Sequence, residues 1–268
     1  MHPRTYWSRL FLKNLQLCGL LLIVIVSAYP TFATQIDNVV VRKSVSKSNR
    51  EELARRLRTI TGWEDLTFDS DGAMKIGNVP PQAGSQGARD LLNSAFTGKR
   101  VILFEDASSR KDVVFCRVDL ATLDHSSISE AFVVLIDFAD FRQVTGDKQA
   151  LAAFNVGWAV LHEIDHVVEE SQDPQEDVAG DCEGRINVMR RELGLPVRNS
   201  YFFSFLPVRN EGNLISRFVR LGFEHPDASS AKRKRYWLIW DAAVVGGLTP
   251  NEQLTRFSEF TRLLDPGH

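Results

Sequence analysis

The sequence predicts a single α+β domain in which a mixed β-sheet precedes a long helix, followed by a mainly helical C-terminal part. Three apolar runs rich in Val, Ile and Phe predict strands, at Val101–Phe104, Val113–Val118 and Ala131–Phe138. A helical pattern then continues from Asp147 to about Glu170, and a second helix is expected over Cys182–Leu193. No internal repeat or low-complexity linker divides this order, so we expect one domain.

Shorter elements are expected before the sheet. Residues 34–47 are interpreted as an exposed N-terminal segment. The capping box Ser48-Asn49-Arg50-Glu51 begins a helix that ends at Gly62. Turn residues in the middle of Leu66–Ile76 predict a hairpin, and a short helix is expected over Ala88–Phe96.

After the second helix the pattern is mixed. Tyr236–Trp240 predicts a strand. Thr249-Pro250-Asn251-Glu252 supplies an N-cap, a proline at the first helical position and a capping-box glutamate, so a final helix is expected there.

The first 33 residues have the layout of a secretory signal peptide. Three basic residues precede an apolar run from Leu17 to Ala28, and Thr31 and Ala33 place small residues at a cleavage site. The run is short for a bilayer span, although an uncleaved signal anchor is the alternative. We therefore expect a signal peptide at 1–33, a folded domain at 34–268, a secreted or periplasmic location, and no stable membrane insertion after cleavage.

Charge and cysteine content narrow the class of protein. The formal net charge is −2 and the pI is about 6.3, so no nucleic-acid partner is expected. Cys18 lies in the signal segment, which leaves Cys116 and Cys182 in the mature chain. In an oxidising compartment these two pair or remain as separate buried thiols, and the sequence does not distinguish the two outcomes.

The motif that carries chemistry is His162-Glu163-Ile164-Asp165-His166. Residues four apart on a helix are separated by about 40° around its axis, so both imidazoles reach one ion. Glu163 points to the flank, where its carboxylate is placed to act as general base on a zinc-activated water.

The segment Trp158–Val168 resembles the active helix of the zincin metallopeptidases, over roughly the middle third of the chain. The resemblance implies a Zn²⁺ cofactor, a hydrolase of the metallopeptidase (protease) type, and a peptide or protein substrate. It also implies His162 and His166 as metal ligands and Glu163 as the catalytic residue. Asp165 departs from the pattern, because zincins usually have an uncharged residue at that position.

The third metal ligand has to come from the acidic segment after the motif. The metzincin continuation with a third histidine is absent, because Glu169 follows and the next histidine is His225. In gluzincins a glutamate on a second helix completes the site, and the resemblance therefore implies Glu183, with Asp181 as the alternative. The other members of the run are expected to be solvated. They are Glu169, Glu170, Asp173, Glu176 and Asp177.

Other parts of a hydrolytic site remain open. Arg198, Tyr201 and His225 are candidates for a group that stabilises an oxyanion. The aromatic run Tyr201–Phe205 either lines a specificity pocket or packs in the core. By analogy with zincins, the strand Ala131–Phe138 offers an edge to an extended peptide. Two alternatives to a peptidase are a non-catalytic secreted binding protein on the same scaffold and a cell-wall peptide amidase.

Overall fold

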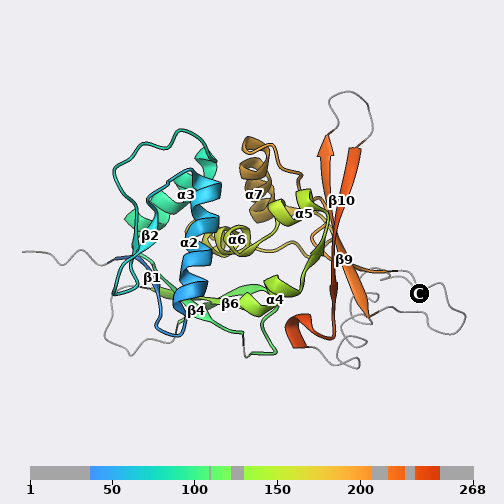
Figure 1. The fold of residues 1–268 in the computed structure, drawn as a ribbon, viewed down its shortest axis with the longest axis horizontal. Helices are drawn as coiled ribbons and strands as arrows, with labels where there is room; N and C mark the ends of the chain where they lie inside the picture. Colours follow the sequence, from blue (N-terminus) through green and yellow to red (C-terminus); the bar gives the residue numbers. More distant parts are fainter. Residues whose placement is uncertain (1–36, 109, 122–129, 207–216, 227–232, 248–268) are drawn as a thin grey trace, which may run out of the picture. The chain divides into compact units, whose positions relative to one another are not determined.

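The computed structural model of the chain describes residues 37–108, 110–121, 130–206, 217–226 and 233–247, and these form the mixed α+β architecture that the sequence predicts (Figure 1). The expected signal segment, with Cys18, and the expected helix at Thr249–Glu252 lie outside the described residues. Within the described ranges no helix has both the length and the apolarity needed to cross a bilayer.

The first sheet has the strand order β1-β4-β6-β5. The strands β4 (Val101–Asp106) and β6 (Ala131–Ile136) run parallel, whereas β5 (Cys116–Leu120) pairs antiparallel with β6 at one edge. Both predicted strands at β4 and β6 are confirmed. The third begins later than predicted, because Phe115 has a left-handed backbone (φ 62°) that interrupts the extended run.

An N-terminal strand was not expected. Val39–Val41 forms β1 and pairs in parallel with β4, so the interpretation of residues 34–47 as an exposed segment is wrong for these three residues, although residues 42–44 are exposed as expected and residues 34–36 lie outside the described part of the chain. Val39 and Val41 are buried on one side of the strand, and the gain from burying such branched side chains explains the pairing.

The two predicted N-terminal helices are confirmed as α2 (Lys47–Thr61) and α3 (Gln86–Thr97). Ser46, rather than Ser48, caps α2 by accepting the Asn49 N–H, and Ser85 caps α3 in the same way. The expected hairpin between them consists of β2 (Thr67–Phe68) and β3 (Met74–Lys75).

The long helix predicted from Asp147 to Glu170 is divided in two, α5 (Lys148–Ala153) and α6 (Val156–Glu169). Asn155 causes the division, because its side chain accepts the Gly157 N–H and begins α6 as an N-cap. The indole of Trp158 then donates to the Ala152 carbonyl at 2.9 Å, which joins the end of α5 to the start of α6. Before them lie α4 (Phe138–Gln143) and β7 (Thr145–Gly146).

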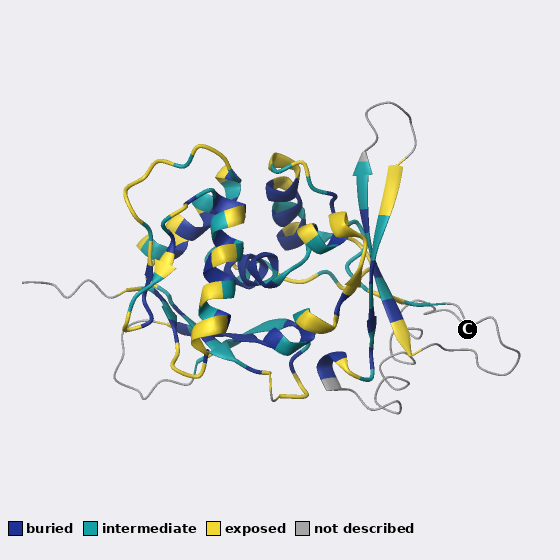
Figure 2. Ribbon diagram, in the orientation of Figure 1, coloured by how far each residue is buried: buried dark blue, intermediate teal, exposed yellow. Residues whose placement is uncertain are grey.

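The helix α6 is buried around most of its circumference (Figure 2). It contacts strands β5 and β6 of the first sheet and three helices, α2, α3 and α7 (Gly180–Glu192). Gly157 permits the close approach of α2, because a Cβ there would lie 2.8 Å from the Arg56 side chain. The motif therefore lies on the central helix of the first hydrophobic core.

The expectation of a mainly helical C-terminal part is wrong for the residues that are described. After α7 the chain forms β8 (Ser204–Phe205), β9 (Phe218–Pro226) and β10 (Arg233–Asp241), which join β7 in an antiparallel sheet. Alternating burial of Val219, Leu221 and Phe223 has the period of a strand. The strand predicted at Tyr236–Trp240 is confirmed within β10.

Asp140 on α4 joins the two sheets. Its buried carboxylate accepts the backbone N–H groups of Phe115 and Gly246 at 3.0–3.1 Å. Both donors have left-handed backbones, and Gly246 lies in the 3₁₀ turn at Val245–Gly247. Burial raises the pKa of Asp140 to about 6, although the two backbone hydrogen bonds oppose the shift.

We expect Asp140→Ala to lower the free energy of unfolding by about 2–4 kcal/mol, because two buried N–H groups lose their acceptor. Asp140→Asn retains an oxygen acceptor and is the matched control. Since the folded-state pKa is raised, Asp140 binds more protons in the folded than in the unfolded protein between about pH 4 and 6, and its contribution to stability falls as pH rises through that window. Other carboxyl groups titrate in both proteins, so the measurement is the difference in free energy of unfolding between the wild type and Asp140→Asn, which should fall as pH rises through the window.

Candidate metal centre

The two histidines of α6 point to the same place. Their Nε2 atoms lie 3.1 Å apart, and their ring planes are nearly perpendicular, with centroids 4.7 Å apart. Both side chains are about nine-tenths buried. The helical spacing thus brings His162 and His166 together as expected.

Asp173 lies directly beside both nitrogens. Its Oδ1 is 3.1 Å from Nε2 of His162 and 3.2 Å from Nε2 of His166. Donor atoms bound to one tetrahedral ion at about 2.0–2.1 Å lie about 3.3 Å from one another. The three observed separations are close to that value, so these side chains fit a divalent cation with nitrogen and oxygen ligands. The Asp173 side chain is about half exposed, which leaves the centre open to solvent on its side.

Each imidazole has a separate acceptor on its Nδ1 side. Nδ1 of His162 lies 3.2 Å from Oε2 of Glu183, and Nδ1 of His166 lies 2.9 Å from the carbonyl oxygen of Ser171. An acceptor at Nδ1 fixes the proton there and leaves the Nε2 lone pair for a metal. The hydrogen-bond network thus assigns the tautomer that a metal ligand requires.

Glu183 is therefore behind His162, not beside the two Nε2 atoms. Its carboxylate is fully buried on α7 between the guanidinium groups of Arg190 and Arg198. Burial opposes ionisation, but the two arginines and His162 hold the pKa of Glu183 well below its ordinary value. The carboxylate beside the two Nε2 atoms is that of Asp173, while the alternative, Asp181, is exposed in the first turn of α7.

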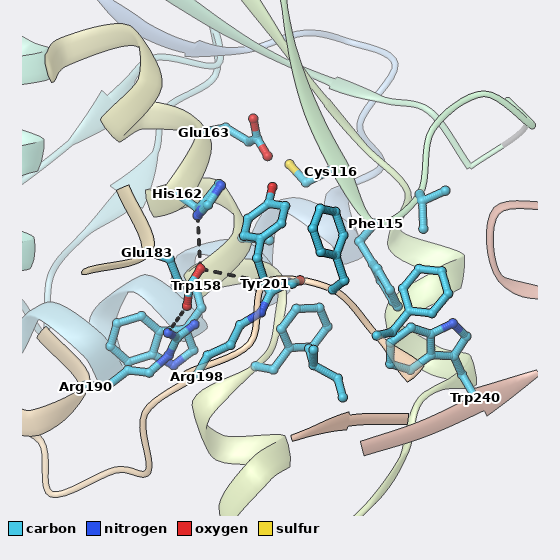
Figure 3. Close-up of a pocket in the computed structure, with 16 residues that line it drawn as sticks. Phe115, Cys116, Trp158, His162, Glu163, Glu183, Arg190, Arg198, Tyr201 and Trp240 are labelled. Carbon is cyan, nitrogen blue, oxygen red and sulfur yellow. Dashed lines mark hydrogen bonds and ion pairs between the residues drawn. The ribbon is translucent and has the colours of Figure 1, made fainter. Parts of the chain in front are cut away.

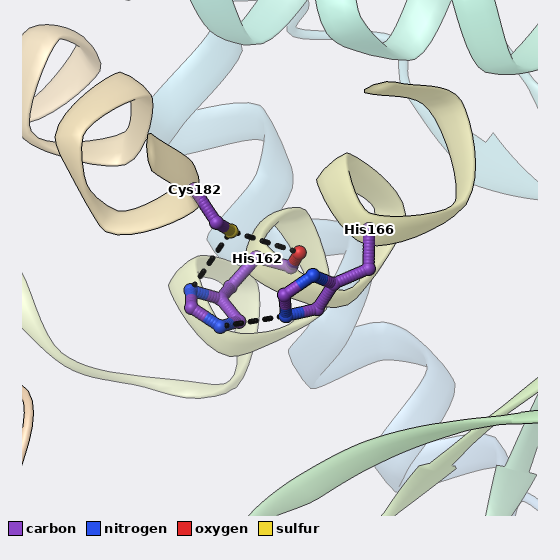
Figure 4. Close-up of side chains that lie close together, drawn as sticks. All are labelled: His162, His166 and Cys182. Atoms are coloured by element: carbon purple, nitrogen blue, oxygen red, sulfur yellow. Dashed lines mark hydrogen bonds between the residues drawn. The ribbon is translucent and has the colours of Figure 1, made fainter. Parts of the chain in front are cut away.

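Cys182 offers a second, less compact donor set (Figure 4). The ligand atoms of His162, His166 and Cys182 lie within 4.8 Å of one another, and the thiol is 3.3 Å from Nδ1 of His162. That nitrogen is on the opposite side of the ring from the Nε2 pair. Burial raises the pKa of the Cys182 thiol to about 11, although His162 opposes the shift. Cys116 and Cys182 are both free, which resolves the question of their pairing.

Glu163 and His162 both line a cavity of about 380 Å³ (Figure 3). Its carboxylate is buried, and it is hydrogen-bonded to the backbone of Val118 on β5. Burial raises the pKa of Glu163, and the neighbouring His162 and His166 lessen the shift. A carboxylate in this environment is a stronger base than one in water.

Tyr201 contributes a hydroxyl to the same cavity. It forms a hydrogen bond with Asp173, and its ring centroid is 6.2 Å from that of His162. Burial, together with the Asp173 charge, raises its pKa far above the ordinary value, so the phenol is a neutral donor. Of the other two candidates, Arg198 lies under the Tyr201 ring and contacts Glu183, whereas His225 pairs with Lys234 on β10.

The rest of the cavity is lined mainly by aromatic side chains from both hydrophobic cores (Figure 3). Phe202 and Phe203, from the aromatic run that the sequence singles out, are among them. The described lining residues with aromatic rings are Phe115, Phe154, Trp158, Tyr201, Phe202, Phe203 and Trp240.

Asp173 is the site residue that the sequence did not select. It lies seven positions after His166 and immediately before Pro174, in a run of acidic residues with similar spacing. The following proline is the one local signal of a fixed turn. Nothing in the spacing shows that the loop folds back over α6, because that depends on contacts with α7.

Comparison with known proteins gives no match: no family model, no curated protein and no solved structure matches the chain.

We expect Asp173→Ala to weaken zinc binding by more than about 100-fold, because it removes one of three ligand atoms and not only an orienting group. Asp181→Asn is the matched control, since that exposed side chain lies outside the cluster. Zinc affinity is measured by chelator competition on the purified protein. Equal affinities for the two variants would contradict Asp173 as a ligand.

Proposed function

We propose that the chain is an exported zinc-dependent peptidase of zincin type, with His162, His166 and Asp173 as the metal ligands. The observation that carries the proposal is the convergence of two Nε2 atoms and one carboxylate oxygen at 3.1–3.2 Å, next to the buried Glu163. The signal peptide expected from the sequence of residues 1–33 supports a secreted or periplasmic enzyme. The nitrogen and oxygen donors, with one open side, are typical of a catalytic zinc site.

A bound zinc ion supplies a Lewis acid that polarises a carbonyl group and acidifies water. Glu163 is positioned to take the proton from that water and to deliver it to the leaving amine. Its burial raises its basicity towards the range where a general base works best at neutral pH. The hydrogen bond to the Val118 backbone holds its carboxylate towards the cavity.

Tyr201 is the best placed of the three oxyanion candidates. Its hydroxyl is protonated, donates to Asp173 and borders the cavity that contains Glu163. To stabilise an oxyanion, this one O–H would turn from Asp173 to the substrate oxygen, where a fixed neutral donor stabilises developing negative charge. The guanidinium of Arg198 stacks on the ring of Tyr201 and forms an ion pair with Glu183, so Arg198 is assigned the role of positioning these two side chains.

The strand that borders the site is β5 and not the one that the sequence suggested. Ala131–Ile136 is an inner strand with partners on both sides, so it offers no free edge. In the described part of the sheet β5 has one partner, β6, and it contacts α6. Glu163 is hydrogen-bonded to the Val118 backbone of β5, so an extended peptide that pairs with this edge strand would lie near Glu163, which supports a peptide substrate.

The aromatic lining of the cavity favours a substrate with a bulky apolar side chain next to the bond that is cleaved. The cavity volume of about 380 Å³ is enough for one aromatic side chain. Burying such a side chain contributes about 1.5–3 kcal/mol of binding free energy.

We expect Glu163→Gln to retain zinc but to lose peptide hydrolysis by at least about 10²–10⁴-fold, because the amide cannot accept the proton. Glu169→Gln, at the exposed end of α6, is the matched control. The measurements are zinc content and the rate of cleavage of casein and a mixed peptide library.

The same assays separate the alternatives. Cleavage of peptidoglycan peptides but not of casein would identify a cell-wall amidase. A zinc-loaded wild type that cleaves neither substrate would indicate a non-catalytic binding protein. Full activity in Glu163→Gln would contradict the mechanism.

We also expect Ala159→Leu, which adds bulk to the cavity wall on α6, to lower kcat/KM for bulky apolar substrates by about 10-fold or more. Substrates with alanine at that position should lose little. Ala152→Leu, an exposed position on α5, is the control. An equal loss for both kinds of substrate would show that the cavity does not select the side chain.

A further inference from the structure

Asp165, inside the motif, is the most buried charged side chain of α6, with no exposed surface. Its carboxylate accepts two hydrogen bonds from Arg185 on α7, at 2.6 and 2.7 Å, and a third from the Ser171 hydroxyl at 2.7 Å. The Arg185 side chain is 40% exposed, so the pair loses the hydration of the buried carboxylate, and such a pair contributes little net stability compared with an apolar side chain of the same volume. The stability of the core alone therefore does not account for a carboxylate here.

Ser171 connects this ion pair to the metal centre. Its side chain is bound to Asp165, while its carbonyl oxygen accepts the Nδ1 proton of His166 at 2.9 Å. Its hydroxyl is also 3.2 Å from the same nitrogen. Asp165 thus positions Ser171, and the carbonyl oxygen of Ser171 fixes the tautomer of His166.

Two further features fix the course of the loop between α6 and α7, one a backbone conformation and the other a contact. At its start Glu170 takes a left-handed backbone (φ 53°), which reverses the chain after the last turn of α6. In the middle of the loop Pro174 packs on Gly180, the first residue of α7, where a Cβ would lie 2.9 Å from the proline ring. Asp173 lies between Ser171, which is hydrogen-bonded to Asp165, and Pro174, which packs on Gly180, so the chain is fixed on both sides of Asp173.

We infer that Asp165 and Arg185 form a positioning device that holds the loop at Ser171–Asp173 against the two histidines and so sets the third ligand. This inference rests on the proposed metal centre. It assigns a use to the one motif residue that departs from the zincin pattern. Asp165 does not touch the reacting atoms and acts through Ser171 on His166 and Asp173.

The test is zinc affinity in Ser171→Ala and Asp165→Asn, measured by chelator competition, with Gln172→Ala as the exposed control from the same loop. We expect Ser171→Ala and Asp165→Asn to weaken zinc binding by about 10–100-fold and Gln172→Ala to leave it unchanged. Ser171→Ala removes one of the three hydrogen bonds to the buried Asp165 carboxylate but leaves the ion pair with Arg185, so the melting temperature of the metal-free variant should fall by only several degrees. The absorption spectrum of the cobalt-substituted protein should change in Ser171→Ala, since it reports the ligand geometry.

A double-mutant cycle shows whether Ser171 acts through Asp173. If it does, Ser171→Ala in an Asp173→Ala background should lower zinc affinity much less than it does in the wild type. Wild-type affinity and cobalt spectrum in both Ser171→Ala and Asp165→Asn would overturn the inference and leave the proposed function intact. Absence of stoichiometric zinc in the wild type would overturn both.

Discussion

The constraint on which the rest of the structure depends is the burial of polar side chains on the central helix. The helix α6 brings His162, Glu163 and Asp165 into the core, where each requires a partner. Glu183 is the partner of His162, the backbone of β5 is the partner of Glu163, and Arg185 is the partner of Asp165. These needs explain why α7 packs along α6 with its own charged residues turned inwards.

A second buried group joins this arrangement to the C-terminal sheet. The guanidinium of Arg190, fully buried, contacts Glu183 and Asn187 and donates to the Ala153 carbonyl at the end of α5. It lies 5.3 Å from the Trp158 ring and 5.5 Å from the Phe223 ring, at the boundary of the two hydrophobic cores. Arg190 thus neutralises Glu183 and also packs against Trp158 in the wall of the cavity, so it contacts both the residues around His162 and the aromatic lining.

Two carboxylates on the acidic segment lie in environments that their spacing did not predict. Glu183 is buried and fixed by two arginines, which suits a group that orients an imidazole. Asp173 is half exposed on a loop, which suits a donor beside an open coordination side. The surroundings of each carboxylate, rather than its residue type, make this difference. The charge of Glu183 is already neutralised by two arginines, so its carboxylate is less attractive to a cation than that of Asp173. Asp165 lies in a third environment, in which the carboxylate is bound to Arg185 of α7 and to Ser171 of the loop that carries Asp173.

The sequence by itself determined the local features: the helix that carries the motif, the common direction of its two imidazoles, the main strands β4, β6 and β10, and the mixed α+β class. These follow from periodicity, capping and spacing, which act over a few residues. It did not determine the break at Asn155, because the long pattern of α5 and α6 is helical on both sides of it. It also missed β1 and β9, since a short or irregularly flanked strand is stable only with its partner. Tertiary structure alone placed Asp173 rather than Glu183 beside the two Nε2 atoms, and made β5 rather than β6 the edge strand. Both depend on which distant segments meet, and the energies that bring them together come from burial and ion pairing between α6, its loop and α7.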